Sequence, residues 1–251
     1  MEEQVPATPT ISMGDIIINV FASPAEAFEG IRTSPTRAST WLIPIVLVML
    51  LASGFTWMIF SNESMRNQVI DSQRERLQER VQAGKMTQDQ ADQATQGMEK
   101  AGGMFVAFGI IASVVFISLA FFGAGLVFWL TGRFGLKAAG GYGKYLELWG
   151  ATQWIGILGI IVMMLLAMTY NSMYASPSAA LVVLDHYNQL NSTHRLLASL
   201  NVFTIWQMVV VGIGLSKFSG KSNGTGIGVA LGLWIIWVVC SVYGFAALGM
   251  A

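Results

Sequence analysis

Long uninterrupted apolar stretches dominate the hydrophobic pattern of this chain. Five of them reach the length of about 20 residues that a helix needs to cross a bilayer: residues 41–60, 103–131, 148–170, 196–216 and 225–250. Their polarity does not alternate from residue to residue, as it does in the strands of a membrane barrel. We therefore predict an all-α fold, with five transmembrane helices forming one membrane domain over residues 41–250.

The segment before the first span, residues 1–40, has an amphipathic pattern. Ser12 and Asp15 have the spacing of a helix capping box. Apolar residues then recur at helical intervals, at Met13, Ile16, Ile17, Val20 and Phe21. Ser23-Pro24 starts a second helix, because proline is favoured at the first helical position. We predict a pair of amphipathic helices that lie in the membrane interface or pack under the bundle.

A charged segment, residues 61–102, separates the first two spans. It mixes basic and acidic residues, and a turn-like Ala83-Gly84-Lys85 is followed by a capping box at Thr87 and Gln90. This pattern predicts a helical hairpin on the extracytoplasmic side. Such a hairpin is either a solvated structural element or a docking surface for a partner.

The composition supports a membrane protein and excludes several other classes. Hydrophobic residues make up 54% of the chain and charged residues only 11%, whereas soluble domains carry about 25% charged residues. The 14 basic and 14 acidic residues cancel, so no net charge attracts nucleic acid. We expect neither a soluble enzyme nor a disordered chain.

The basic residues of the short loops predict the orientation. One side of the membrane collects seven of them, at Arg32, Arg37, Arg133, Lys137, Lys144, Lys217 and Lys221. The short loops of the other side hold Arg195. Because cytoplasmic loops are enriched in Lys and Arg, we expect a cytoplasmic N-terminus and an extracytoplasmic C-terminus.

Candidate chemistry inside the spans is sparse. No ionisable residue lies deep in a predicted span, and Glu147, at the start of the third, is the nearest exception; proton-coupled carriers usually need such residues at depth. Polar residues in or beside the spans should turn inward and hydrogen-bond across helices, or line the path of a transporter or channel-like subunit. They are Gln153, Asn201, Thr204 and Gln207.

Two further features invite a functional interpretation. Asp185, His186 and His194 share one loop and have the chemistry of zinc ligands, although their spacing matches no specific zinc motif; they support the hypothesis of a metal-dependent membrane enzyme. Gly224, Gly228 and Gly232 recur every four residues. Such a stripe lets another helix approach closely, either within the bundle or from another subunit.

Short motifs resemble those of the YIP1 family, in its bacterial branch. They are the apolar helix at residues 15–21, the helix start Ser23-Pro24, the Trp41-Leu42-Ile43-Pro44 entry to the first span, and the Gly-Gly-Tyr-Gly-Lys-Tyr stretch at residues 140–145, with Gly141 and Tyr142 as the family's Gly-Tyr pair. The resemblance implies five spans, a cytoplasmic N-terminus and, for a bacterial member, the inner membrane. Eukaryotic members bind prenylated GTPases through an Asp-Leu-Tyr-Gly-Pro motif, which has no counterpart here.

These patterns favour a non-enzymatic integral membrane protein that acts through partners, as an accessory subunit or scaffold of a membrane complex. The expected partners are the lipid bilayer and other membrane proteins or further copies of the chain. We expect no catalytic residue, no cofactor and no resident metal.

Overall fold

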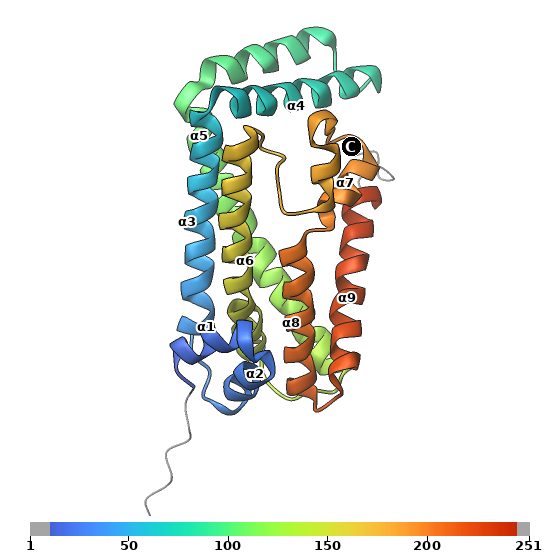
Figure 1. Ribbon diagram of the computed structural model, residues 1–251. Coiled ribbons are helices and arrows are strands. Elements are labelled where there is room, and N and C mark those ends of the chain that lie inside the picture. Colours follow the sequence, from blue (N-terminus) through green and yellow to red (C-terminus); the bar gives the residue numbers. More distant parts are fainter. Residues whose placement is uncertain (1–10, 245–251) are drawn as a thin grey trace, which may run out of the picture. The chain divides into compact units, whose positions relative to one another are not determined.

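A computed structural model describes residues 11–244 and shows an all-helical protein (Figure 1). Within the described residues, five helices are long and apolar enough to cross a membrane: Ser39–Ser61, Val106–Gly135, Tyr142–Tyr170, Val202–Ser219 and Asn223–Gly244. The predicted all-α fold with five spans is therefore confirmed. Residues 1–10 of the N-terminal segment and residues 245–250 of the predicted fifth span lie outside the described residues.

The helices follow one another in a simple order. Those of the first half are α1 (Met13–Ala22), α2 (Pro24–Thr33), α3 (Ser39–Ser61), α4 (Glu63–Gln82), α5 (Gln88–Leu130) and the π-helical turn η1 (Thr131–Gly135). Those of the second half are α6 (Tyr142–Tyr170), the 3-10 helix η2 (Ala179–His186), α7 (Ser192–Ser199), α8 (Val202–Ser219), α9 (Asn223–Val239) and η3 (Cys240–Gly244).

The described part of the chain divides into two compact units. The first unit contains residues 11–48, 118–158 and 203–235. The second unit contains residues 49–117, 159–202 and 236–244.

Two predicted span starts differ from the helix starts of the structure. The third span begins at Tyr142 rather than 148, because the charges of Lys144 and Glu147 pair with each other inside the helix instead of ending it. The fourth begins at Val202 rather than 196. Residues 192–199 form the separate helix α7, which starts where the Asn191 side chain accepts hydrogen bonds from two backbone N–H groups.

In the first unit, α1 and α2 are part of the buried core. Ser12 Oγ accepts the backbone N–H of Asp15 at 3.1 Å, so α1 starts at the capping box. Ile16 and Val20 of α1 and Phe28 of α2 are fully buried, in one cluster with residues of α6, α8 and α9. The helix pair is therefore packed under this part of the bundle through its apolar side.

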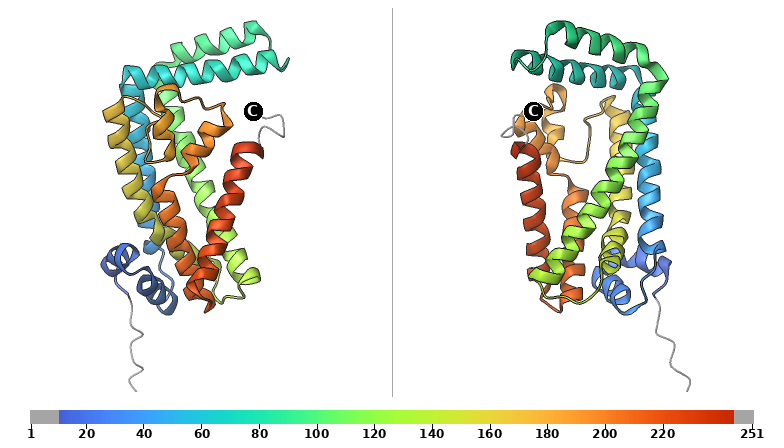
Figure 2. Two further views of the ribbon diagram at one scale, coloured as in Figure 1. Left: turned by 45° about the vertical axis from the view of Figure 1, so that its right-hand side comes forward. Right: turned by 180° about the vertical axis from the view of Figure 1, so that it is seen from behind.

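In the second unit, α4 does not continue α3. Asn62 separates them with an extended backbone, and its side chain caps α4 by accepting the N–H of Met65. Figures 1 and 2 show α4 lying across the end of α3, beside the first part of α5. Gln68 of α4 donates to the Asn171 carbonyl at 3.0 Å and accepts the Met173 N–H at 3.0 Å. The hairpin thus packs on residues that follow α6; docking of a partner on it stays a prediction.

Candidate functional site

The motif at residues 140–145 forms the turn into α6. Gly140 has a φ of +110°, a conformation that L side chains rarely adopt. Tyr142 is the first residue of α6, and its hydroxyl donates to the Phe122 carbonyl of α5 at 2.8 Å. A Cβ on Gly141 would meet nothing within 4 Å. The two residues of the Gly-Tyr pair therefore differ in role, since Tyr142 joins two spans and Gly141 belongs to the turn.

Lys144 and Glu147 form a buried ion pair in the first turns of α6. Lys144 Nζ lies 2.7 Å from Glu147 Oε2, and the two side chains are only 14% and 2% exposed. The same ammonium donates to the carbonyls of Ile31 at 2.6 Å and Ser34 at 2.7 Å. Glu147 Oε1 accepts the backbone N–H of Arg37 at 2.7 Å. We call these five residues the anchor.

The anchor ties the N-terminal helices to α6. Ile31 and Ser34 stand at the C-terminal end of α2, where helix carbonyls lack intrahelical donors and carry partial negative charge. The Lys144 ammonium satisfies two of them and Glu147 balances its charge. A buried charge is tolerated only when it is paired and hydrogen-bonded, and this arrangement meets both conditions. The role of the anchor is structural, because the ammonium of Lys144 and the carboxylate of Glu147 bond to each other and to backbone groups of the same unit.

Close packing around the anchor depends on small residues. A Cβ on Gly150 would lie 2.4 Å from Trp41 Cα, and one on Gly132 would lie 2.1 Å from the Tyr145 hydroxyl. Tyr145 is fully buried, and its ring meets Phe218 of α8 edge to face at 5.4 Å. The start of α6 is thereby held against α3, η1 and α8.

The polar residues of the spans are used for packing where the structure shows their bonds. Gln207 of α8 donates to the backbone carbonyl of Thr152 at 3.2 Å and to its hydroxyl at 3.3 Å. Gln153 donates to Trp149 of its own helix at 3.5 Å. Asn201 precedes α8, forming an isolated bridge with Ser178. The interhelical bond predicted for Gln207 is present.

Replacing Gln207 by Met should lower the free energy of unfolding by about 0.6–1.7 kcal/mol, because one interhelical hydrogen bond in a membrane is worth that much. The shape of the side chain is nearly kept, so little cavity cost is added. Unfolding of the solubilised protein by SDS measures the change. Thr169→Val is the matched control, since its hydroxyl donates only within α6. An equal loss in both variants would contradict the interhelical role.

The glycine stripe does not make the close contact between the last two spans. A Cβ on Gly228 or Gly232 would meet nothing within 4 Å, and one on Gly224 would meet only Ser222 Oγ at 4.0 Å. The close crossing lies on another side of α9, where a Cβ on Gly226 would be 2.2 Å from the Gly212 carbonyl oxygen. The three glycines of the stripe therefore make no close helix contact within the described residues, and Gly224 and Gly228 are exposed.

The loop histidines lie together without a metal-binding arrangement. The rings of His186 and His194 are 5.5 Å apart and edge to face, and His194 Nδ1 accepts the backbone N–H of Asn188 at 3.0 Å. Among the described residues, no group of three or more His, Cys, Asp or Glu side chains is placed to hold a metal ion.

Comparison with known proteins agrees with this architecture. The sequence matches the Yip1 domain over residues 18–245, which covers most of the chain. The chain belongs to the Yip1 domain family. The Yip1 match begins within α1 and includes the anchor and all five candidate spans up to Gly244.

A relative from Bacillus subtilis (strain 168), the membrane protein YknW, is 28% identical over 232 residues, covering 90% of this chain and 88% of that protein. No solved structure matches. Among the short motifs of the sequence, the Gly-Gly-Tyr-Gly-Lys-Tyr segment at residues 140–145 makes contacts with other helices in the structure. The sequence singled out its Gly-Tyr pair, whereas Lys144 and Tyr145 make its buried contacts.

Proposed function

We propose that this Yip1 protein is a non-enzymatic membrane protein that works by association, as an accessory subunit or a scaffold. The observation that carries the proposal is the open side of α9, with Gly224, Gly228 and Gly232 one turn apart. In lipid, helices associate through close packing of small residues rather than through hydrophobic burial. Gly224 and Gly228 are exposed and Gly232 is partly buried, so this side of α9 suits a helix of a partner.

Large apolar side chains continue the exposed surface of α9 beyond the stripe. Ile235, Ile236 and Trp237 are 53%, 61% and 66% exposed. A partner helix would contact these large apolar side chains as well as the glycines. Either a second copy of the chain or another membrane protein has the chemistry to fill it.

The use of the buried polar groups also favours association over chemistry. Lys144, Glu147 and Gln207 are each committed to bonds within the first unit. Catalysis or proton coupling in a membrane usually needs ionisable groups that face a cavity or each other at depth. The groups described here serve packing instead.

We further propose the bacterial inner membrane as the location, with a cytoplasmic N-terminus. Counted over the short loops alone, seven basic residues belong to the first unit and Arg195 to the second; the long charged segment 61–102, also in the second unit, balances its six basic residues with acidic ones and is left out of the count. The asymmetry follows the positive-inside rule, and the relative YknW is a bacterial membrane protein.

Gly228→Leu should remove association without unfolding the chain, because the new side chain fills the space of a partner helix and its Cβ meets nothing of its own chain within 4 Å. Gly123→Leu on α5 is the matched control: this glycine is also exposed, and a Cβ there also meets nothing within 4 Å. The measurement is cross-linking in native membranes followed by native gel electrophoresis, with two differently tagged copies to distinguish self-association from a second protein.

The expected result is a cross-linked complex with wild type and Gly123→Leu that Gly228→Leu loses. A chain that migrates alone in all three samples, or a complex that both substitutions leave intact, would refute association through this stripe. Thermal unfolding of the purified variants shows whether the loss comes from the surface or from the fold.

A further inference from the structure

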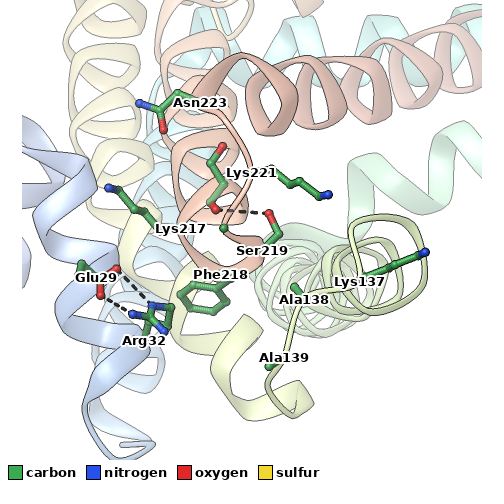
Figure 3. Close-up of a pocket in the computed structure, with 12 residues that line it drawn as sticks. Glu29, Arg32, Lys137, Ala138, Ala139, Lys217, Phe218, Ser219, Lys221 and Asn223 are labelled. Carbon is green, nitrogen blue, oxygen red and sulfur yellow. Dashed lines mark hydrogen bonds and ion pairs between the residues drawn. The ribbon is translucent and has the colours of Figure 1, made fainter.

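A basic cavity of about 600 Å³ opens in the first unit, beside the α8–α9 turn. Its lining includes four cationic side chains and one carboxylate, at Arg32, Lys137, Lys217, Lys221 and Glu29 (Figure 3). Phe218 and Ala138 supply an apolar wall. The volume lies within the range of about 300–1,000 Å³ typical of small-molecule sites.

The carboxylate of the cavity, Glu29, is paired with a cation of its own, Arg32. Arg32 Nε donates to Glu29 Oε2 at 3.2 Å. The hydrogen bond from Arg32 holds the pKa of Glu29 below its usual value; burial opposes this shift, and the charges of Arg32 and then Lys217 add to it. Glu29 thus stays ionised as the counter-ion of Arg32, and it does not cancel the charge of the three lysines.

The three lysines have no direct counter-ion of their own. Among the described residues, none of Lys137, Lys217 and Lys221 makes an ion pair within 4.0 Å or a side-chain hydrogen bond. Their ammonium groups point apart, Lys217 toward the side of Glu29 and the other two away from it (Figure 3). Like charges around one cavity repel each other, and an anion placed between them would reverse that cost.

The backbone also brings Lys137 to the cavity at a cost. Its φ is +56°, a left-handed conformation that favours glycine and is uncommon for other residues. It follows the end of η1, where a glycine is the usual residue. Lys137 therefore stands at a position where the backbone conformation favours glycine.

The lysines stand at the ends of membrane spans. The second span ends at Gly135, two residues before Lys137. Lys217 lies in the last turn of the span that ends at Ser219, and Lys221 precedes the span that begins at Asn223. This is the level at which lipid headgroups lie. Leu130 and Phe134, on the last turns of the second span, are 40% and 73% exposed and offer an apolar surface for acyl chains.

We propose that this cavity binds the phosphate of an anionic phospholipid headgroup, with the three lysines as its ligands. Flexible lysine stems can turn the ammonium groups inward onto a phosphate while their methylene groups stay on apolar surface. Basic pockets between span ends are a recurring way to bind anionic headgroups. Free phosphate shares the anionic chemistry, but the position at the span ends and the exposed apolar surface favour a lipid.

The test uses the full chain in neutral detergent, titrated with short-chain phosphatidylglycerol and followed by native mass spectrometry. Lys137→Gln/Lys217→Gln/Lys221→Gln should weaken phosphatidylglycerol binding about 100-fold, since each basic residue near an anionic headgroup contributes about fivefold. The matched control is Arg66→Gln/Arg80→Gln/Lys85→Gln, which removes three exposed positive charges from the second unit. Parallel titrations use phosphatidylcholine and inorganic phosphate.

The proposal predicts saturable binding of phosphatidylglycerol over phosphatidylcholine, which the cavity variant loses and the control keeps. It is overturned if the cavity variant binds as wild type does, if both variants lose binding equally, or if phosphatidylcholine binds equally well. Displacement of the lipid by inorganic phosphate at comparable concentration would assign the site to free phosphate and overturn the lipid. Thermal unfolding without lipid separates a binding defect from a folding defect.

Discussion

Lys144→Met is expected to lower the free energy of unfolding by about 3–5 kcal/mol, the cost of removing one partner of a buried ion pair. The buried Glu147, only 2% exposed, then loses the cation that pairs with it, and the carbonyls of Ile31 and Ser34 lose their donor. SDS-induced unfolding of the solubilised chain, followed by tryptophan fluorescence, measures the change. Trypsin cleavage after Arg32 and Arg37 should accelerate as well, because the end of α2 is no longer held to α6.

Arg74→Met is the matched control for this experiment. Arg74 and Asp71 are also three residues apart on a helix, but their side chains are 46% and 65% exposed and 3.4 Å apart. Exposed pairs contribute about 1 kcal/mol or less. The double variant Lys144→Met/Glu147→Gln should recover part of the loss, since it removes the unpaired charge. An equal, small effect of Lys144→Met and Arg74→Met would show that the anchor does not hold the fold.

The anchor is a feature that the sequence alone does not predict, because its contacts join residues far apart in the chain. The five spans follow from continuous apolar runs, and α1 follows from a capping box and an apolar stripe, because each signal is local. The sequence also places Lys144 three residues before Glu147. What it does not contain is the meeting of Lys144 with Ile31 and Ser34, which lie 113 and 110 residues away in the chain. Without those carbonyls, the two charges look like an interfacial pair, and the third span is predicted six residues late.

The spacing of the glycines in α9 does not indicate which side of the helix faces the bundle. On an amphipathic helix the polar side identifies the buried side by exclusion, but α9 is apolar on all sides and gives no such reference. The spacing of Gly224, Gly228 and Gly232 is real, yet the contact with α8 is made by Gly226, which is out of phase with them. Which side of such a helix faces its own bundle is decided by the shape of the neighbouring helix.

Gly226→Ala is therefore expected to destabilise the chain by about 3 kcal/mol, at the upper end of the usual cost of overpacking. Its new Cβ would lie 2.2 Å from the Gly212 carbonyl oxygen and 2.9 Å from the backbone nitrogen of Ser216. These are backbone atoms of α8, which cannot rotate away as a flexible side chain can, so the two helices must separate. SDS-induced unfolding measures the loss.

Gly228→Ala, two residues further along the same helix, is the matched control for this prediction. The same methyl group enters the same apolar helix, and it meets nothing within 4 Å. Any effect of alanine on helix propensity or on the unfolded state is shared by both variants, so their difference isolates the crossing with α8. A loss of stability in Gly228→Ala with Gly226→Ala unchanged would reverse the sides of α9, placing the stripe in the bundle and removing the open surface on which the proposed association depends.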